Sequence, residues 1–230
     1  MLGTSWARVT DDIAYRTVRE NVKALLADPR AAVDARVPAC PEWTVRDLVA
    51  HLVDNTVSAF RWASAEPPEV PAADASAERL LDTWLRLGEG VDVHLRAHDG
   101  ERGPSLLVMD AFTHEIDLRY AIGAPVPTEH VAYRRALGLL TGGFGESVRR
   151  HGLPSVRVVS DGADWVCGPG EPAVTLTASR HDLHRTLTGR RSHEQITALD
   201  WNGDPGRWLP AFTWGPFAPP AEPGDVLSAG

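Results

Sequence analysis

Apolar residues recur every three or four positions through most of the first 150 residues of the chain. This spacing places them on one face of an amphipathic helix. Proline and glycine interrupt the pattern, because proline cannot continue the helical hydrogen-bond ladder and glycine commonly follows a helix end. The pattern predicts helices from about Asp11 to Asp28, Thr44 to Phe60, Ser76 to the break at Gly100, Ser105 to Ile122 and Glu129 to Arg150.

The connection before the second predicted helix carries its own local signals. The segment 37–43 contains Pro38 and Pro41, so we expect a stiff, proline-bounded connection. Thr44 is followed three residues later by Asp47, which is an approximate capping box with Asp in place of the usual Glu. The helix is therefore expected to open at Thr44.

The pattern changes after about residue 155. Short runs with alternating or β-branched residues between glycine turns predict strands at 156–159, 165–167 and 173–177, and 196–199 is a further candidate. Ser179 or Asp182 is expected to cap a short helix to Leu187, and Asp204 to open a last one to about Phe212. The fold class predicted is α+β, with a four-helix bundle in residues 1–152 and a small α+β domain in residues 153–230.

Composition narrows the classes of function. The chain has 230 residues and a formal net charge of −8, without the basic stripe of a nucleic-acid binder. No apolar run is long enough to span a membrane. Its two cysteines, Cys40 and Cys167, are far apart, which favours a reducing cytoplasm over a disulfide scaffold. We expect a cytoplasmic protein, monomeric or homodimeric, that acts on small molecules.

The strongest chemical pattern joins a carboxylate and an imidazole. Asp110 and His114 are four residues apart on a predicted helix, so they lie on one face and can clamp a metal ion. Asp117 follows one turn later and would orient the second ring nitrogen of His114. His51 on the second predicted helix would face the bundle interior. Such a set of ligands leaves a coordination position open, as in catalytic zinc sites. By spacing alone, an Asp and a His one turn apart on a helix are more often a capped or solvated pair.

Other candidate clusters have simpler interpretations. His94 and His98 have the same four-residue spacing but lie near a predicted helix end, where histidines suit the helix dipole. His181 and His184 flank the short C-terminal helix and are expected on a solvated or anion-facing surface. Cys40 has no basic neighbour in sequence that would lower its pKa, so we expect a packed thiol.

Two segments together resemble a known family. The first runs from Val37 to Leu52 and contains Trp43, the stretch TVRDL and His51. The second places Asp110, His114 and the dipeptide 117–118 at fixed intervals. Both are similar to motifs of the mycothiol-dependent maleylpyruvate isomerase family, which belongs to the DinB-like metal-binding bundles. The family's C-terminal domain, related to sterol-carrier proteins, fits the residues beyond about 155.

The resemblance implies a site and an activity. His51, Asp110 and His114 take the metal-ligand positions, for zinc or another divalent ion, although many members have Glu where this chain has Asp110. The metal activates mycothiol. In the isomerases the thiolate adds reversibly to a double bond, rotation follows and the thiol leaves, and in transferase-like relatives it would stay attached to an electrophile.

The resemblance also implies cationic contacts and leaves alternatives open. An acidic product or thiol cofactor needs cations, for which the candidates are Arg190 on the cofactor and Arg191 and Arg207 in catalysis. A metal-dependent isomerase or S-transferase is the first hypothesis. The others are a non-catalytic module that binds a small molecule or partner, and a diverged biosynthetic enzyme that does not use mycothiol.

Overall fold

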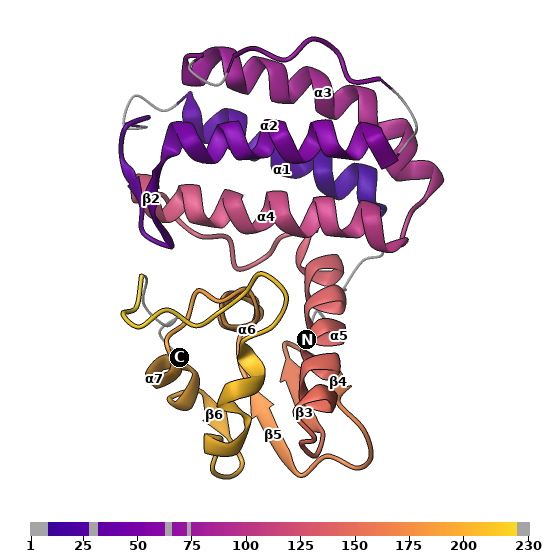
Figure 1. Ribbon diagram of the computed structural model, residues 1–230, viewed down its shortest axis with the longest axis vertical. Coiled ribbons are helices and arrows are strands. Elements are labelled where there is room, and N and C mark those ends of the chain that lie inside the picture. Colours follow the sequence, from indigo (N-terminus) through magenta and orange to yellow (C-terminus); the bar gives the residue numbers. More distant parts are fainter. Residues whose placement is uncertain (1–8, 28–31, 63–65, 73–74, 225–230) are drawn as a thin grey trace, which may run out of the picture. The chain divides into compact units, whose positions relative to one another are not determined.

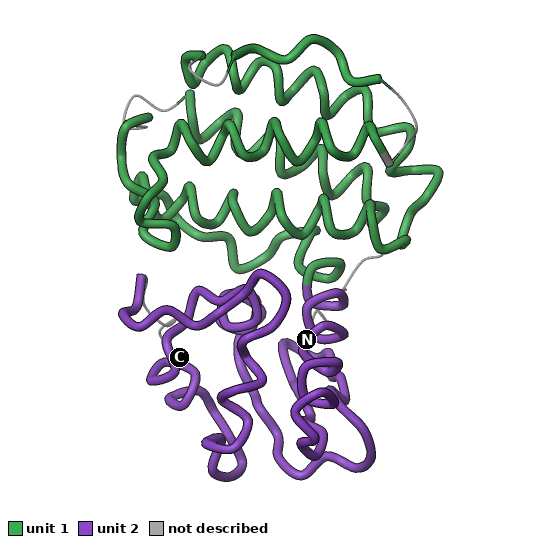
Figure 2. Tube along the Cα trace, viewed as in Figure 1, with its two compact units in different colours: residues 1–136 green, residues 137–230 purple. Residues whose placement is uncertain are grey.

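The computed structural model describes residues 9–27, 32–62, 66–72 and 75–224. The chain divides into two compact units, residues 1–136 and residues 137–230, which are coloured separately in Figure 2. This division falls within a helix, Tyr133–Arg150, whereas the sequence-based boundary at 152/153 falls just after that helix. The boundary at 152/153 therefore stays a prediction of where two independent domains meet. Each unit is described below by itself.

Within the described residues, unit 1 is a bundle of four long helices. They are α1 (Asp11–Leu26), α2 (Val45–Trp62), α3 (Ala77–Ala97) and α4 (Arg102–Ile122). Both α1 and α2 pack against α3 on one side and α4 on the other, as Figure 1 shows. The predicted four-helix bundle is confirmed. The predicted end of the first helix at 28–29 lies outside the described residues.

The helix ends form where the sequence places capping residues. The Ser76 side chain accepts a hydrogen bond from the Arg79 backbone N–H at 3.3 Å. Thr44 and Asp47 cap α2 reciprocally, because Asp47 Oδ2 accepts from the Thr44 N–H at 2.9 Å and Thr44 Oγ1 accepts from the Asp47 N–H at 3.3 Å. Gly123 ends α4 in the left-handed conformation, with φ of 65°. Helix α4 begins at Arg102, three residues before its predicted start at Ser105.

The proline-bounded segment before α2 is not merely a connection. It forms an antiparallel hairpin of β1 (Arg36–Val37) and β2 (Cys40–Thr44), with a register shift between Arg36 and Val37. Strand β2 runs directly into α2, and β1 packs against α4. The hairpin therefore fixes the chain at the start of α2, where the site residues begin.

A small polar layer connects three helices inside the bundle. The Tyr15 hydroxyl of α1 and Thr56 Oγ1 of α2 are 2.6 Å apart. Thr56 gives its only proton to the Leu52 carbonyl at 2.8 Å, so Tyr15 is the donor of this pair. Trp84 Nε1 of α3 donates to the Tyr15 hydroxyl at 3.0 Å. The three side chains are fully buried, and their polar atoms are mutually satisfied.

Unit 2 combines a sheet with short helices over its described residues. Helix α5 (Tyr133–Arg150) leads to strands β3 (Val156–Ser160), β4 (Ala163–Cys167), β5 (Val174–Thr177) and β6 (Asp200–Trp201), in spatial order β4-β3-β5-β6. Strands β3 and β5 are parallel, and the other neighbours are antiparallel. Helices α6 (Arg180–Leu187) and α7 (His193–Thr197) and the 3₁₀ helix η1 (Gly206–Phe212) complete the unit. The α+β fold class is confirmed.

Two predictions in this half were wrong in detail. The candidate strand at 196–199 is the end of α7 and a turn, because Ser192 and Gln195 form a capping box that starts a helix. The fifth helix begins at Tyr133 rather than Glu129. Ser179, in contrast, caps α6 as predicted by accepting from the Asp182 backbone N–H.

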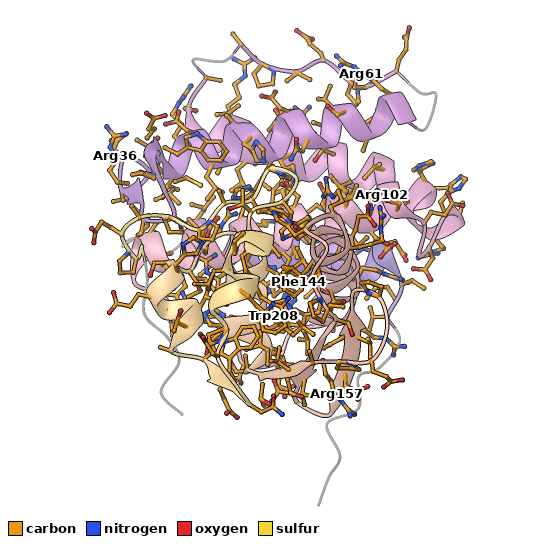
Figure 3. All side chains as sticks on the ribbon, turned by 60° about the horizontal axis from the view of Figure 1, so that its bottom comes forward. Arg36, Arg61, Arg102, Phe144, Arg157 and Trp208 are labelled. Atoms are coloured by element: carbon orange, nitrogen blue, oxygen red, sulfur yellow. The ribbon has the colours of Figure 1, made fainter. Side chains whose placement is uncertain are left out.

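The core of unit 2 is aromatic and aliphatic. Phe144 of α5 stacks on Phe212 of η1 with ring centroids 4.6 Å apart. Trp208 is buried and donates through Nε1 to the Pro154 carbonyl at 2.9 Å. Figure 3 labels Phe144 and Trp208 in the interior and Arg157 at the outer end of the unit, where it pairs with Asp164 across β3 and β4. Among the described helices, none is long and apolar enough to cross a membrane.

Candidate metal centre

The three predicted ligands come together between α2 and α4. His51 lies on α2, and Asp110 and His114 lie one turn apart on α4. Each contributes one donor atom, and the three atoms lie within 4.8 Å of one another. His51 and Asp110 retain partial exposure, whereas His114 is buried. Residues from two helices thus meet with their donor atoms directed at one point.

Two of the three separations between donor atoms are close to those of a tetrahedral zinc site. Asp110 Oδ1 lies 3.4 Å from His51 Nε2 and 3.7 Å from His114 Nε2. Ligands about 2.0–2.1 Å from a tetrahedral ion are about 3.3–3.4 Å from each other. Two imidazole nitrogens and one carboxylate oxygen are also ligands that zinc commonly takes. The donor set fits a divalent ion and leaves one tetrahedral position for water or a thiol.

Asp110 is held as a carboxylate despite its surroundings. Burial by itself raises the pKa of this carboxyl. The electrostatic influence of His114 and the hydrogen bond with His51 outweigh burial, and the resulting pKa lies below its usual value of 3.8. The carboxylate is therefore charged at neutral pH, which is the form that binds a metal ion.

Asp117 lies beside His114, one turn further along the same helix. Its Oδ2 lies 3.1 Å from Nδ1 of His114, and its side chain is fully buried. The predicted proximity of the two residues is confirmed. A carboxylate beside Nδ1 favours a proton there, which leaves the lone pair of Nε2 for a metal ion.

Trp43 covers both histidines from the end of β2. Its ring centroid lies 4.9 Å from that of His51 and 5.6 Å from that of His114, and the two imidazole rings are 4.7 Å apart. The hairpin explains this arrangement, because β2 delivers Trp43 two residues before α2 begins. An indole over the imidazoles restricts water on that side and limits the rotamers that they can adopt.

Asn55 is the site residue that the sequence analysis missed. It lies one helical turn after His51 on α2, and its Nδ2 donates to Asp110 Oδ2 at 2.7 Å. The same Nδ2 lies 3.0 Å from His51 Nε2. The sequence did contain a signal for Asn55, because a residue four positions after a proposed ligand lies on the same face of the helix.

The alternative histidine pair does not form a comparable group. His94 and His98 on α3 have ring centroids 4.4 Å apart, and His98 Nδ1 lies 3.0 Å from Glu101 Oε1 on the exposed surface. Within the residues that the structure describes, only His51, Asp110 and His114 form a set of three possible ligands with closely spaced donor atoms.

The three predicted arginines belong to unit 2 and differ in their surroundings. Arg191 is fully buried and donates to Asp182 at 2.8 Å. Arg190 donates to the Thr188 carbonyl at 2.6 Å. Arg207 is exposed, and its guanidinium lies 5.2 Å from the ring centroid of Trp208. Of the three, Arg207 is the most accessible cation.

Residues 15–119 match the family model described as the mycothiol maleylpyruvate isomerase N-terminal domain. The match includes α2, most of α4 and all three donor residues. Over these residues the helical unit is similar to that domain family. The family resemblance inferred from the two sequence motifs is confirmed.

Individual relatives extend the comparison along the chain. Two uncharacterized proteins of Mycobacterium tuberculosis, from two strains, are each 29% identical over 141 residues, covering 54% of this chain and 78% of the relative. Two solved structures, of the mycothiol-dependent maleylpyruvate isomerase and of a histidine-to-alanine mutant of it, share the fold. They give TM-scores of 0.52 and 0.57 at 15% and 14% identity, and cover 84% of this chain and 91% of theirs.

Proposed function

We propose that the chain is a metal-dependent enzyme that uses mycothiol, or a related low-molecular-weight thiol, for cis–trans isomerisation or S-transfer to an electrophilic small molecule. The observation that carries this proposal is the meeting of His51, Asp110 and His114 at separations suited to one divalent ion. The domain family supports the choice of thiol, because its name specifies mycothiol.

A zinc ion bound to these donors would lower the pKa of a bound thiol and supply a thiolate at neutral pH. Asp110 contributes one negative charge, and the two imidazoles contribute none when they are neutral. Asp117 Oδ2 lies 3.1 Å from Nδ1 of His114, and a carboxylate there favours a proton on Nδ1 and a lone pair on Nε2. Trp43 restricts water over the histidines, so that a thiol competes with less solvent for the open position.

The anionic parts of a thiol or substrate require cations as well. We retain Arg190, Arg191 and Arg207 as proposed contacts of this kind. Arg207 is the most direct to test because it is exposed and its side chain has no buried ion pair to disrupt. Arg207→Ala is expected to raise the KM for the thiol or the substrate without changing zinc content, and an unchanged KM for both would exclude it.

The metal part of the proposal is tested by substitution of the two histidines. After zinc reconstitution and desalting, wild type is expected to retain one zinc per chain, and His51→Ala and His114→Ala are expected to lose it. His94→Ala removes a histidine from the other closely spaced pair and is the matched control, which should keep its zinc. A wild-type protein that stays metal-free after reconstitution contradicts the proposal.

The catalytic part is tested with maleylpyruvate and mycothiol as the first reactants, followed by other electrophiles. Asp110→Glu is the informative variant, because many members of the family have Glu at this position. If Asp110→Glu increases thiol-dependent turnover, the chain is an enzyme of this class. If neither form turns over any thiol adduct while zinc is bound, the chain is a binding module.

A further inference from the structure

The amide of Asn55 is directed at two of the three proposed ligands. Its Nδ2 donates to Asp110 Oδ2 at 2.7 Å and lies 3.0 Å from His51 Nε2. An NH₂ group has two protons, so it can serve both acceptors at the same time. The contact with Asp110 fixes which end of the amide faces the site, because a carboxylate oxygen accepts and the amide oxygen cannot donate to it.

The first consequence concerns Asp110. Its two oxygens have separate roles in this arrangement: Oδ2 accepts from Asn55, and Oδ1 faces His51 Nε2 at 3.4 Å and His114 Nε2 at 3.7 Å. A carboxylate can bind a metal ion through one oxygen or through both. The hydrogen bond uses one lone pair of Oδ2 and turns that oxygen toward Asn55, which favours Oδ1 as the single donor and keeps the fourth tetrahedral position open.

The second consequence concerns the position of His51. The Asn55 amide lies 3.0 Å from His51 Nε2 and 2.7 Å from Asp110 Oδ2, so it connects the imidazole of α2 to the carboxylate of α4.

We infer that Asn55 is a positioning residue, which presents Asp110 as a one-oxygen ligand next to His51 Nε2. The inference rests on the proposed metal site. It assigns to α2 both a ligand and the group that orients the ligand of α4. When an ion takes the lone pair of His51 Nε2, the amide keeps its hydrogen bond to Asp110.

The test removes the amide of Asn55 in two ways. Asn55→Leu keeps the branched shape of the side chain without a hydrogen-bonding group, and Asn55→Ala truncates the side chain at Cβ. Ser58→Ala on the same helix is the control, because Ser58 donates only to the Asp54 carbonyl of its own helix. Circular dichroism establishes that each variant is folded before its zinc affinity is measured by competition with a chelator.

Both substitutions of Asn55 are expected to weaken zinc binding by about 10–100-fold, the usual effect of removing a group that orients a ligand, whereas Ser58→Ala binds as wild type. Wild-type affinity in both Asn55 variants would overturn the inference while leaving the metal site intact. If wild type itself binds no zinc, the proposed function fails and the inference fails with it.

A second measurement does not depend on the metal. Nitrogen NMR of the histidine rings in the metal-free protein is expected to show the ring-nitrogen signals of His51 shifted in Asn55→Leu and unchanged in Ser58→Ala, because Asn55 contacts Nε2 and Ser58 does not. Signals of His51 that Asn55→Leu leaves unchanged would overturn the assigned role.

Discussion

Asp110 is the negatively charged member of the candidate metal centre. Its Oδ1 lies 3.4 Å and 3.7 Å from the two imidazole nitrogens. The carboxylate is ionised because the histidines outweigh the effect of burial on its pKa. The aspartate is therefore compatible with one-oxygen ligation between α2 and α4.

We expect the negative charge of Asp110 to matter more for zinc affinity than the shape of its side chain. Asp110→Asn keeps the volume but removes the negative charge and one anionic ligand. Zinc affinity should fall by more than the ~10–100-fold that is typical for loss of an orienting group. Asp54→Asn, an exposed aspartate on α2, is the control and should bind zinc as wild type does. Equal affinities for the two variants would contradict the assignment of Asp110 as a ligand.

The two cysteines are expected to differ in reactivity. Burial raises the pKa of the Cys167 thiol to about 12, so very little thiolate is present at neutral pH. In a Cys40→Ser variant, Cys167 should react slowly with a disulfide reagent at pH 8 and rapidly after denaturation. Fast labelling in the native state would contradict this. The stabilising effect of the buried neutral thiol is fully present below its ordinary pKa of 9.0 and is lost as pH rises toward 12.

The site also shows what a sequence pattern can reveal at this scale. The four-residue spacing of Asp110 and His114 identified two donors, and the resemblance around Trp43 identified His51. Asn55 was missed because amides occur at many helix surfaces and its importance depends on Asp110, which is distant in sequence. Only the packing of α2 against α4 brings the two together.

At the scale of elements, close contact between helices depends on a small residue. A Cβ atom added to Gly88 of α3 would lie 2.3 Å from Cδ of Arg19. The Arg19 side chain is buried and pairs with Asp92 at 2.6 Å, so it has little freedom to move aside. The contact between α1 and α3 therefore requires glycine at this position.

This contact leads to a prediction on stability. Gly88→Ala is expected to lower the free energy of unfolding by about 1–3 kcal/mol, because the added methyl group forces Arg19 from its ion pair. Gly138→Ala is the matched control, since nothing lies within 4 Å of the added Cβ on α5, and alanine should stabilise that helix by about 0.8–1 kcal/mol. Chemical denaturation measures both. Equal stability of Gly88→Ala and wild type would contradict the argument.

Helical elements were more predictable than extended ones. Apolar periodicity and capping residues such as Ser76 located the long helices closely. The hairpin at 36–44 was missed because its two prolines obscure the strand pattern, and its partner contacts come from α4. For α7, the capping box of Ser192 and Gln195 was present in the sequence but was outweighed by the β-branched residues that follow.

For the whole molecule, metal binding and folding stability are linked. An ion that binds only the folded chain stabilises it by about 2.7 kcal/mol at a free concentration of 100 times Kd. Zinc should therefore raise the thermal midpoint of wild type, and a chelator should reverse the effect. His51→Ala should show no such rise. A midpoint that rises equally in this variant would locate the stabilising ion elsewhere.

The boundary between the two units is a feature of the whole molecule that the sequence pattern did not predict. The change from helical to strand-like patterns near residue 155 predicted the order of the two parts and their fold class. The contact-based division at 136/137 falls inside α5, which the sequence pattern represents as one continuous helix. Continuity of a helix does not determine with which neighbours each of its turns packs.

The central claim is that His51, Asp110 and His114 hold one divalent metal ion. Elemental analysis after zinc reconstitution and desalting tests it most directly, in wild type and in the folded His51→Ala, His114→Ala and His94→Ala variants. We expect one zinc per chain in wild type and His94→Ala, and almost none in the other two. A metal-free wild type, or full zinc content in His51→Ala and His114→Ala, would contradict the claim.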